Sequence, residues 1–240
     1  MSDESTFIAG KLKVADWEAR KAELSGENPT STWKDTFKDF FVQRLEQRYL
    51  KPIRILQCCG SLEGEGFSIL AIQCSLIEFL ASTRQGLNYQ HGAEKNNKDH
   101  KYGDSQDMFV SFLRKLAPFS QTFTCKKYAK YFYVNIRCGI LHEAATKNGW
   151  RIKANHPKKD AVADVGKCIV YRNNFQKAIE QYVEAYGREL AANKELQDAF
   201  IRKYDHIAKQ CRTGGNESAQ KPTTPPSKPK QQSTKTGDQR

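Results

Sequence analysis

The chain has 240 residues and a formal net charge of +12, with 38% hydrophobic, 11% aromatic and 28% charged residues. This length fits one domain with room for a tail, and the aromatic content suffices to close a core. The composition therefore excludes a large multidomain machine and a wholly disordered protein. A positive chain favours polyanions as partners, because Lys and Arg neutralise phosphates and release their counterions.

Cysteine usage and apolar patterning predict the compartment. The seven cysteines are an odd number and none forms a C-x2-C pair of the kind that holds zinc, so we expect reduced thiols and no metal. The longest apolar stretch, residues 67–80, is interrupted by polar residues, and the first residues lack a signal pattern. We expect a cytoplasmic protein with no membrane partner and no cofactor.

The chain ends in a segment of a different composition. Residues 214–240 hold half of the eight prolines and no aromatic or branched aliphatic residue, which predicts a disordered basic tail. This tail carries a charge of +3, so residues 1–213 carry +9. The folded part is therefore basic in its own right.

Before the tail, most of the sequence has helical periodicity. Residues 33–49 predict an amphipathic helix that Thr30 or Ser31 caps and that ends near Pro52. Residues 67–82 are apolar nearly all round, which predicts the central helix of a bundle. A polar loop over residues 84–106 comes next. Further helices are expected at 108–116, ended by Pro118, at 122–145, at 175–190 behind Asn173 or Asn174, and at 196–207.

Two short stretches, residues 150–154 and 167–171, have strand character and can pair as a small β-hairpin. We therefore predict an all-α fold, a bundle of five to six helices with this hairpin. The predicted organisation is an N-terminal segment with a short helix (1–29), a helical domain (30–213) and the tail (214–240).

One pattern in this sequence points to a chemical reaction: an arginine and a following histidine with four to six residues between them. Arginine can hold a scissile phosphate while neutral histidine takes a proton from the ribose 2′-hydroxyl, which suffices to cleave RNA without a metal. Three pairs fit: Arg84 with His91, Arg137 with His142, and Arg151 with His156. Only Arg137 and His142 fall within a predicted helix, where apolar neighbours hold the backbone.

The stretch RCGILH, Arg137 to His142, resembles the motif helix of the HEPN superfamily, the helical-bundle RNases and toxins of bacterial defence and their relatives. The run continuing to NGW is similar to one group of uncharacterised bacterial members. The resemblance implies a metal-independent endoribonuclease that acts as a homodimer, in phage defence or a toxin system, with a possible antitoxin or regulatory partner. Arg137 and His142 would be catalytic, and Glu78 would match an acidic residue that several families carry on the preceding helix.

Two features leave a second hypothesis open, a catalytically silent HEPN-like module that binds RNA or a protein partner. Cys138 follows the arginine where the family commonly has Asn, Asp or His, so its supporting role is open beside that of a small core residue. Five residues turn an ideal helix by about 500°, which leaves Arg137 and His142 about 140° apart. Arg137 also has a structural alternative, an ion pair with Glu78 or Glu143.

Basic residues flank the motif on both sides. Lys126, Lys127 and Lys130 alternate with tyrosines before it, and Arg151 and Lys153 follow it. Such mixtures suit RNA, whose backbone needs cations and whose unpaired bases stack on rings. A solvated helix face with its aromatics in the core is the alternative.

Overall fold

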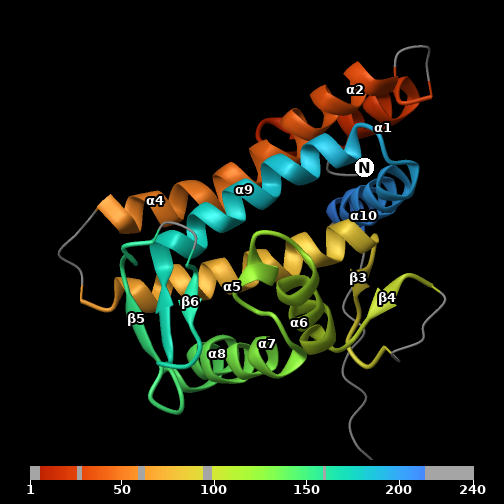
Figure 1. Cartoon of the computed structure of the whole chain (residues 1–240). Coiled ribbons are helices and arrows are strands. Elements are labelled where there is room, and N and C mark those ends of the chain that lie inside the picture. Colours follow the sequence, from red (N-terminus) through yellow and green to blue (C-terminus); the bar gives the residue numbers. More distant parts are fainter. Residues whose placement is uncertain (1–5, 26–28, 59–62, 94–98, 159–160, 214–240) are drawn as a thin grey trace, which may run out of the picture.

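The computed structural model describes residues 6–25, 29–58, 63–93, 99–158 and 161–213 (Figure 1). The predicted tail, residues 214–240, lies outside the described residues. The described part is mainly helical, with seven helices and three small sheets. Five helices are single segments: α1 (Val14–Glu23), α5 (Glu65–Gln85), α6 (Ser105–Lys115), α9 (Arg172–Leu190) and α10 (Lys194–Thr213). The second helix is continuous and consists of α2 (Pro29–Thr36), η1 (Phe37–Val42), α3 (Gln43–Leu45), η2 (Glu46–Leu50) and α4 (Lys51–Cys58). Another continuous helix consists of α7 (Lys126–Phe132), η4 (Tyr133–Cys138) and α8 (Gly139–Glu143), and a short 3-10 turn, η3 (Phe119–Gln121), precedes it.

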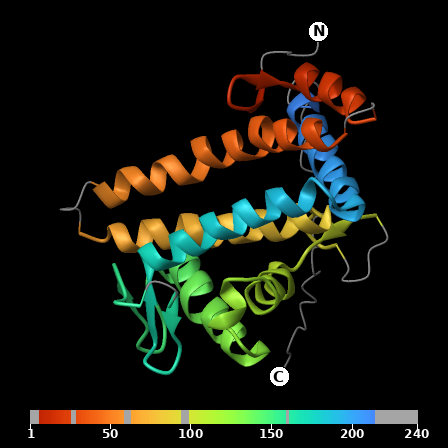
Figure 2. The ribbon, with the colours of Figure 1, turned by 45° about the horizontal axis from the view of Figure 1, so that its top comes forward.

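The mainly helical class is confirmed, and each of the six helices predicted after residue 30 is present. The helix count exceeds the predicted five to six because α1 is added to them. Helix α5 is central: α4, α6, α9 and α10 all pack against it, as does the helix formed by α7, η4 and α8. In Figure 2 the long helix from α2 to α4, α9 and α5 run side by side.

Helix α5 is also the one described helix long and apolar enough to cross a membrane by length and composition. Ten of its residues are buried, including Ile69, Leu70, Leu76 and Ile77. An apolar surface on every side of a helix has to be covered by other elements, which the surrounding helices do here. Its burial identifies α5 as a core helix.

The predicted helix end near Pro52 is wrong, because the helix runs through this proline to Cys58. Proline normally breaks a helix by lacking an N–H and by contact between its ring and the carbonyl four residues earlier. Here the wide turn η2 directly precedes Pro52, and the N–H of Lys51 donates to the carbonyl of Glu46, five residues back. This shift of the hydrogen-bond ladder relieves the contact that would end the helix.

The predicted strands are present, but their pairing differs from the prediction. Strand β5 (Arg151–Lys153) pairs with β7 (Ile169–Tyr171) in parallel, so these two strands do not form a hairpin. The hairpin is formed instead by β6 (Ala163–Asp164) and β7, which are antiparallel. The other sheets are β1 (Phe7–Ala9) with β2 (Leu12–Lys13) and β3 (Asn88–Tyr89) with β4 (Lys101–Tyr102).

The side chains of Asn173 and Asn174 do not cap α9 as predicted, since Tyr171 is its N-cap residue. Asn174 instead accepts a hydrogen bond from the backbone N–H of His156 and donates one to the carbonyl of Lys158. These two bonds join the start of α9 to the loop that follows β5.

The N-terminal segment packs into the same core as the rest of the chain. Trp17 on α1 is fully buried, its ring centroid lying 5.3 Å from that of Phe40 and 5.2 Å from that of Tyr204. The indole N–H of Trp17 donates to Asp205 at 2.9 Å. Helix α1 is therefore held to α10 and to the long helix by both apolar and polar contacts.

We expect Gly187→Ala to destabilise the protein by up to about 2 kcal/mol, because a Cβ there would lie 2.5 Å from the Phe37 ring and overpack the contact between α9 and η1, at a cost of about 1–3 kcal/mol. The higher helix propensity of alanine offsets about 1 kcal/mol of this cost. Urea unfolding measures the difference. The matched control is Gly166→Ala, where the Cβ meets one atom at 3.6 Å; equal stability of the two variants would contradict the clash.

Candidate functional site

Arg137 and His142 lie on the helix formed by α7, η4 and α8, which we call the motif helix. A buried asparagine holds the C-terminal end of this helix. Asn135 donates from its side chain to the carbonyl of Tyr131 at 2.8 Å and accepts from the side chain of Asn148 at 2.7 Å. The backbone N–H of Lys147 donates to the carbonyl of Asn135 at 3.0 Å. The chain therefore folds back tightly on the helix directly after His142.

The motif itself spans a change of helix type. Arg137 lies in the π-helical turn η4, whereas His142 lies in the α-helical segment that begins at Gly139. A π turn contains one more residue per hydrogen-bonded ring than an α turn, so residues five apart move toward the same face. The π turn includes the first two residues of the motif, Arg137 and Cys138. Such turns occur frequently at functional sites.

Arg137 is held by Glu78, the ion pair that the sequence left open beside Glu143. The guanidinium donates to the carboxylate at 3.1 Å, and the side chains are 18% and 19% exposed. The Arg137 guanidinium also lies 5.3 Å from the centre of the Tyr133 ring. One partner comes from α5 and the other from the motif helix, so the head group has a defined position and still reaches solvent.

Two residues that the sequence did not single out complete this cluster. Tyr102, in the predicted loop, places its hydroxyl 3.4 Å from Glu78, and burial together with the negative charge of Glu78 raises the pKa of that phenol. Ser105, the first residue of α6, lies 3.0 Å from the hydroxyl of Tyr133. The sequence carries no spacing signal for either, since both meet the motif through tertiary packing.

His142 has a different environment from Arg137. Its side chain is exposed and has no hydrogen-bond or ion-pair partner among the described residues. Neither a hydrogen bond nor an ion pair joins it to Arg137 or Glu78 in the described part of the chain. The imidazole is therefore accessible to solvent.

Cys138 is half-buried and packs against the core beside the motif. Below it, burial raises the pKa of the Cys74 thiol to about 12, an effect that the nearby Arg137 charge opposes. Cys74 therefore stays a neutral thiol at physiological pH and contributes to packing. Cys138 is in the position of a small residue at the edge of this apolar layer.

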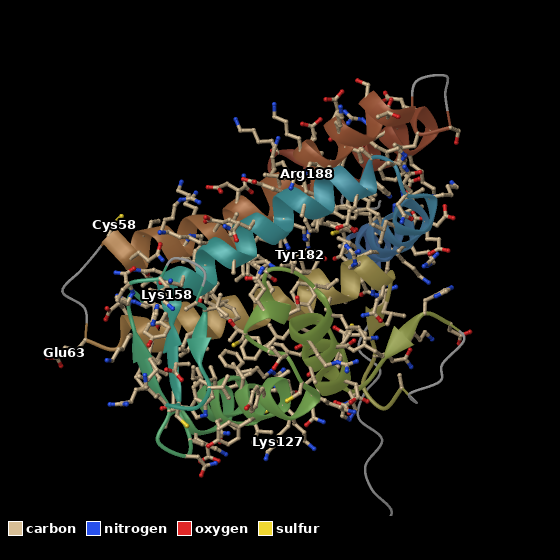
Figure 3. All side chains as sticks on the ribbon, viewed as in Figure 1. Cys58, Glu63, Lys127, Lys158, Tyr182 and Arg188 are labelled. Atoms are coloured by element: carbon tan, nitrogen blue, oxygen red, sulfur yellow. The ribbon has the colours of Figure 1, made fainter. Side chains whose placement is uncertain are left out.

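The five predicted RNA-binding side chains are all exposed, and none forms an ion pair in the described residues. Three lie in the first turns of α7, at the opposite end of the motif helix from His142, and Figure 3 labels one of them, Lys127. The other two are on one face of β5, two residues apart. They are Lys126, Lys127, Lys130, Arg151 and Lys153.

Apolar side chains are also exposed on the motif helix. Val134 is 38% exposed and Leu141 is 49% exposed. They are seven residues apart, about two helical turns, and so lie on roughly the same face. Arg137 lies between them in the chain, and His142 directly follows Leu141.

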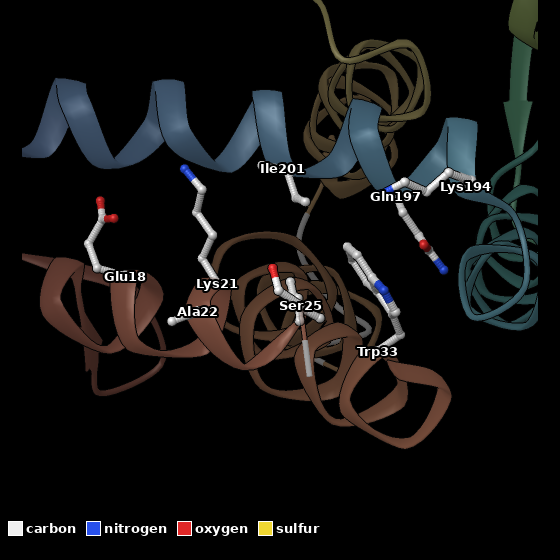
Figure 4. Close-up of a pocket in the computed structure, with 9 residues that line it drawn as sticks. Glu18, Lys21, Ala22, Ser25, Trp33, Lys194, Gln197 and Ile201 are labelled. Atoms are coloured by element: carbon white, nitrogen blue, oxygen red, sulfur yellow. The ribbon is translucent and has the colours of Figure 1, made fainter. Parts of the chain in front are cut away.

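One cavity borders a predicted site residue. Lys153 lines this cavity of about 350 Å³ with the exposed ring of Phe67 and with Arg172, which pairs with Glu65 at the start of α5. A larger cavity of about 710 Å³ lies between α1 and α10 and contains none of the predicted site residues (Figure 4). Its charged side chains are already paired, Lys21 with Asp205, Glu18 with Arg212 and Lys194 with Asp198.

Comparison with known proteins returned no match to a protein-family model, a curated protein or a solved structure. Among the described residues, no group of three or more His, Cys, Asp or Glu side chains is arranged to hold a metal ion.

Glu78→Gln and Arg137→Met should each lower the free energy of unfolding by about 1–3 kcal/mol, since each leaves a largely buried polar group without its partner. The double variant should cost less than the sum of the two, by about 1–2 kcal/mol, because the interaction can be lost only once. Urea unfolding of all four proteins gives this coupling energy.

The exposed pair formed by Glu143 and Lys147 provides the matched control cycle. Its side chains are 57% and 39% exposed at a separation of 3.0 Å, so its coupling should be only about 0.3–0.5 kcal/mol. Additive effects at Glu78 and Arg137 would show that their ion pair adds nothing to stability.

Proposed function

We propose that this protein is a metal-independent endoribonuclease of HEPN type that acts as a cytoplasmic homodimer, in phage defence or a toxin system. The observation that carries the proposal is the arrangement around the motif. Arg137 is oriented by Glu78 and still reaches solvent, and His142 is exposed and has no partner in the part of the chain that the structure describes. Basic side chains that form no ion pair with any described residue flank both ends of this helix.

In the proposed reaction, His142 takes the proton of a ribose 2′-hydroxyl while Arg137 stabilises the charge that develops on the phosphate. The 2′ oxygen bonds to phosphorus and the bond from phosphorus to the 5′ oxygen breaks. The imidazolium then returns its proton to the leaving 5′ oxygen. The products are a 2′,3′-cyclic phosphate and a free 5′-hydroxyl.

A homodimer can bring together the side chains of Arg137 and His142, which no hydrogen bond or ion pair joins among the described residues of one protomer. The exposed apolar side chains Val134 and Leu141 supply a surface on which two motif helices can pack about a two-fold axis. In such a dimer His142 of one protomer faces Arg137 of the other. The active site is then shared between two chains.

The second candidate is a catalytically silent HEPN-like module that binds RNA or a protein partner, an antitoxin or other regulator. Its support is the ion pair itself, because Glu78 neutralises the arginine that should hold a phosphate. Cys138 adds to this support, since a thiol beside the apolar layer orients a phosphate less well than an amide or carboxylate would. Binding of RNA without cleavage would favour this candidate.

Cleavage of a mixed single-stranded RNA in excess EDTA tests the first proposal. His142→Ala and Arg137→Met should each reduce the cleavage rate at least about 100-fold, the contribution typical of a general acid–base group. His91→Ala and Arg114→Ala, which alter an exposed histidine and an exposed arginine outside the motif, should cleave at the wild-type rate. Thermal melts confirm that each variant is folded.

The proposed mechanism fails if EDTA abolishes cleavage or if His142→Ala retains full activity. Mass spectrometry of the fragments provides an independent criterion, because a 3′-hydroxyl product is incompatible with attack by the 2′ oxygen.

Leu141→Glu should convert the dimer to a monomer and reduce RNA cleavage, because it buries a charge in the proposed apolar contact. Sedimentation equilibrium of the wild type and the variant gives the oligomeric state. Ile55→Glu is the matched control, since Ile55 is also exposed but lies on α4. An active monomeric variant would show that one chain carries the complete site.

A further inference from the structure

A second cavity lies at the C-terminal end of α5, away from the motif. It has a volume of about 290 Å³ and is formed by α5, α6, the residue after α6 and the start of α10. Its polar lining consists of Arg84 and Gln85 from α5 and Ser111 and Lys115 from α6. We refer to these four residues and the space between them as the α5-end cavity.

Buried polar groups without partners are concentrated beside this cavity. The hydroxyl of Tyr186 is buried and has no hydrogen-bond partner among the described residues. The Nη1 group of Arg84 and the hydroxyl of Tyr182 are also buried and have only each other as partners there, so the Tyr182 O–H has no acceptor. The Nε group of Arg202 is also buried and has no hydrogen-bond partner among the described residues. The Nη2 group of the same side chain donates to the carbonyl of Gln85. Native proteins satisfy nearly all buried polar groups, so each exception needs a reason.

The two tyrosines are directly behind Arg84. Tyr182 packs on Phe112 of the cavity wall with ring centroids 4.6 Å apart, and its own ring is stacked on that of Tyr186 at 6.0 Å. The Arg84 guanidinium lies 5.7 Å from the centre of the Tyr186 ring. Figure 3 shows Tyr182 between α9 and α5. These groups form one cluster, in which Arg84 lines the cavity and the two tyrosines lie behind it.

All of these groups can donate hydrogen bonds. Burial raises the pKa of both phenols, so their hydroxyls stay protonated at physiological pH, and guanidinium groups have no acceptor at all. Arg84, Lys115 and Arg202 supply three positive charges, of which Glu189 neutralises one through its ion pair with Arg84 at 2.5 Å. Lys115 is exposed and forms no ion pair in the described part of the chain.

We propose that the α5-end cavity binds the phosphate group of a small molecule. A phosphate offers several acceptor oxygens and negative charge to a site that presents donors and an excess of cations, and arginine matches its geometry through paired N–H groups. The volume is at the lower end of the range for small-molecule sites, which favours a compact phosphomonoester. This site is separate from the proposed RNA-cleaving residues and does not depend on them.

Tyr182→Phe tests the proposal, because it removes a hydroxyl whose O–H has no acceptor among the described residues. In phosphate-free buffer the melting temperature of this variant should stay close to that of the wild type. Isothermal titration with inorganic phosphate and with adenosine 5′-monophosphate should show binding to the wild type, and affinity at least tenfold weaker for Tyr182→Phe. Lys115→Gln should weaken binding similarly without altering the core.

Tyr128→Phe and Lys51→Gln are the matched controls, since they change an exposed tyrosine and an exposed lysine elsewhere and should bind as the wild type does. Absence of binding to the wild type, or equal affinity of Tyr182→Phe, would overturn the proposal. So would a melting temperature of Tyr182→Phe far below that of the wild type without phosphate, because the hydroxyl would then have an acceptor in the free protein.

A single-stranded RNA hexamer without terminal phosphates separates the two sources of a phosphate group. If the hexamer does not compete with inorganic phosphate, the small-molecule assignment is supported. If it competes, and if its own binding weakens in Tyr182→Phe, the cavity belongs to the RNA path and the small-molecule assignment is wrong. RNA cleavage by Lys115→Gln should equal that of the wild type, whether or not the endoribonuclease proposal holds.

Discussion

The burial of α5 is the constraint on which the rest of this structure depends. A helix that is apolar nearly all round can be stable in water only when other elements cover each of its sides. Its few charged residues must then be paired, because an isolated buried charge costs several kcal/mol. Glu65 pairs with Arg172, Glu78 with Arg137 and Arg84 with Glu189, at the start, middle and end of the helix.

Each of these ion pairs lies beside a cavity or includes a candidate catalytic residue. The pair of Glu65 borders the cavity that Lys153 and Phe67 line, the pair of Glu78 orients the motif arginine, and the pair of Arg84 borders the α5-end cavity. At each of these three places an oppositely charged side chain of a covering element meets a charged residue of α5. The pattern of charges along this one helix therefore determines where polar sites can form in an otherwise apolar bundle.

Periodicity predicted the helices well because each of them buries one face, as with the predicted helix at 175–190 and the observed α9. It failed at Pro52 and at the pairing of β5, where the outcome depends on a shifted hydrogen-bond ladder and on which distant strand lies alongside. The ion pair of Arg137 was predictable only as a choice between Glu78 and Glu143. Tyr102, Ser105 and the cluster behind Arg84 were missed because they meet through contacts between residues far apart in sequence.

The environments of Arg137 and His142 bear on the choice between a catalyst and a binding module. If one protomer formed the whole site, the pair with Glu78 would compete with phosphate for Arg137, and His142 would have no group to act with. In a two-fold dimer the same pair acts differently, because it holds the guanidinium at a fixed position while the other chain supplies the imidazole. The ion pair then orients Arg137, and this orientation lowers the reorganisation that phosphate binding requires. Dimerisation, rather than the identity of the residue after Arg137, is the property that separates the two functions.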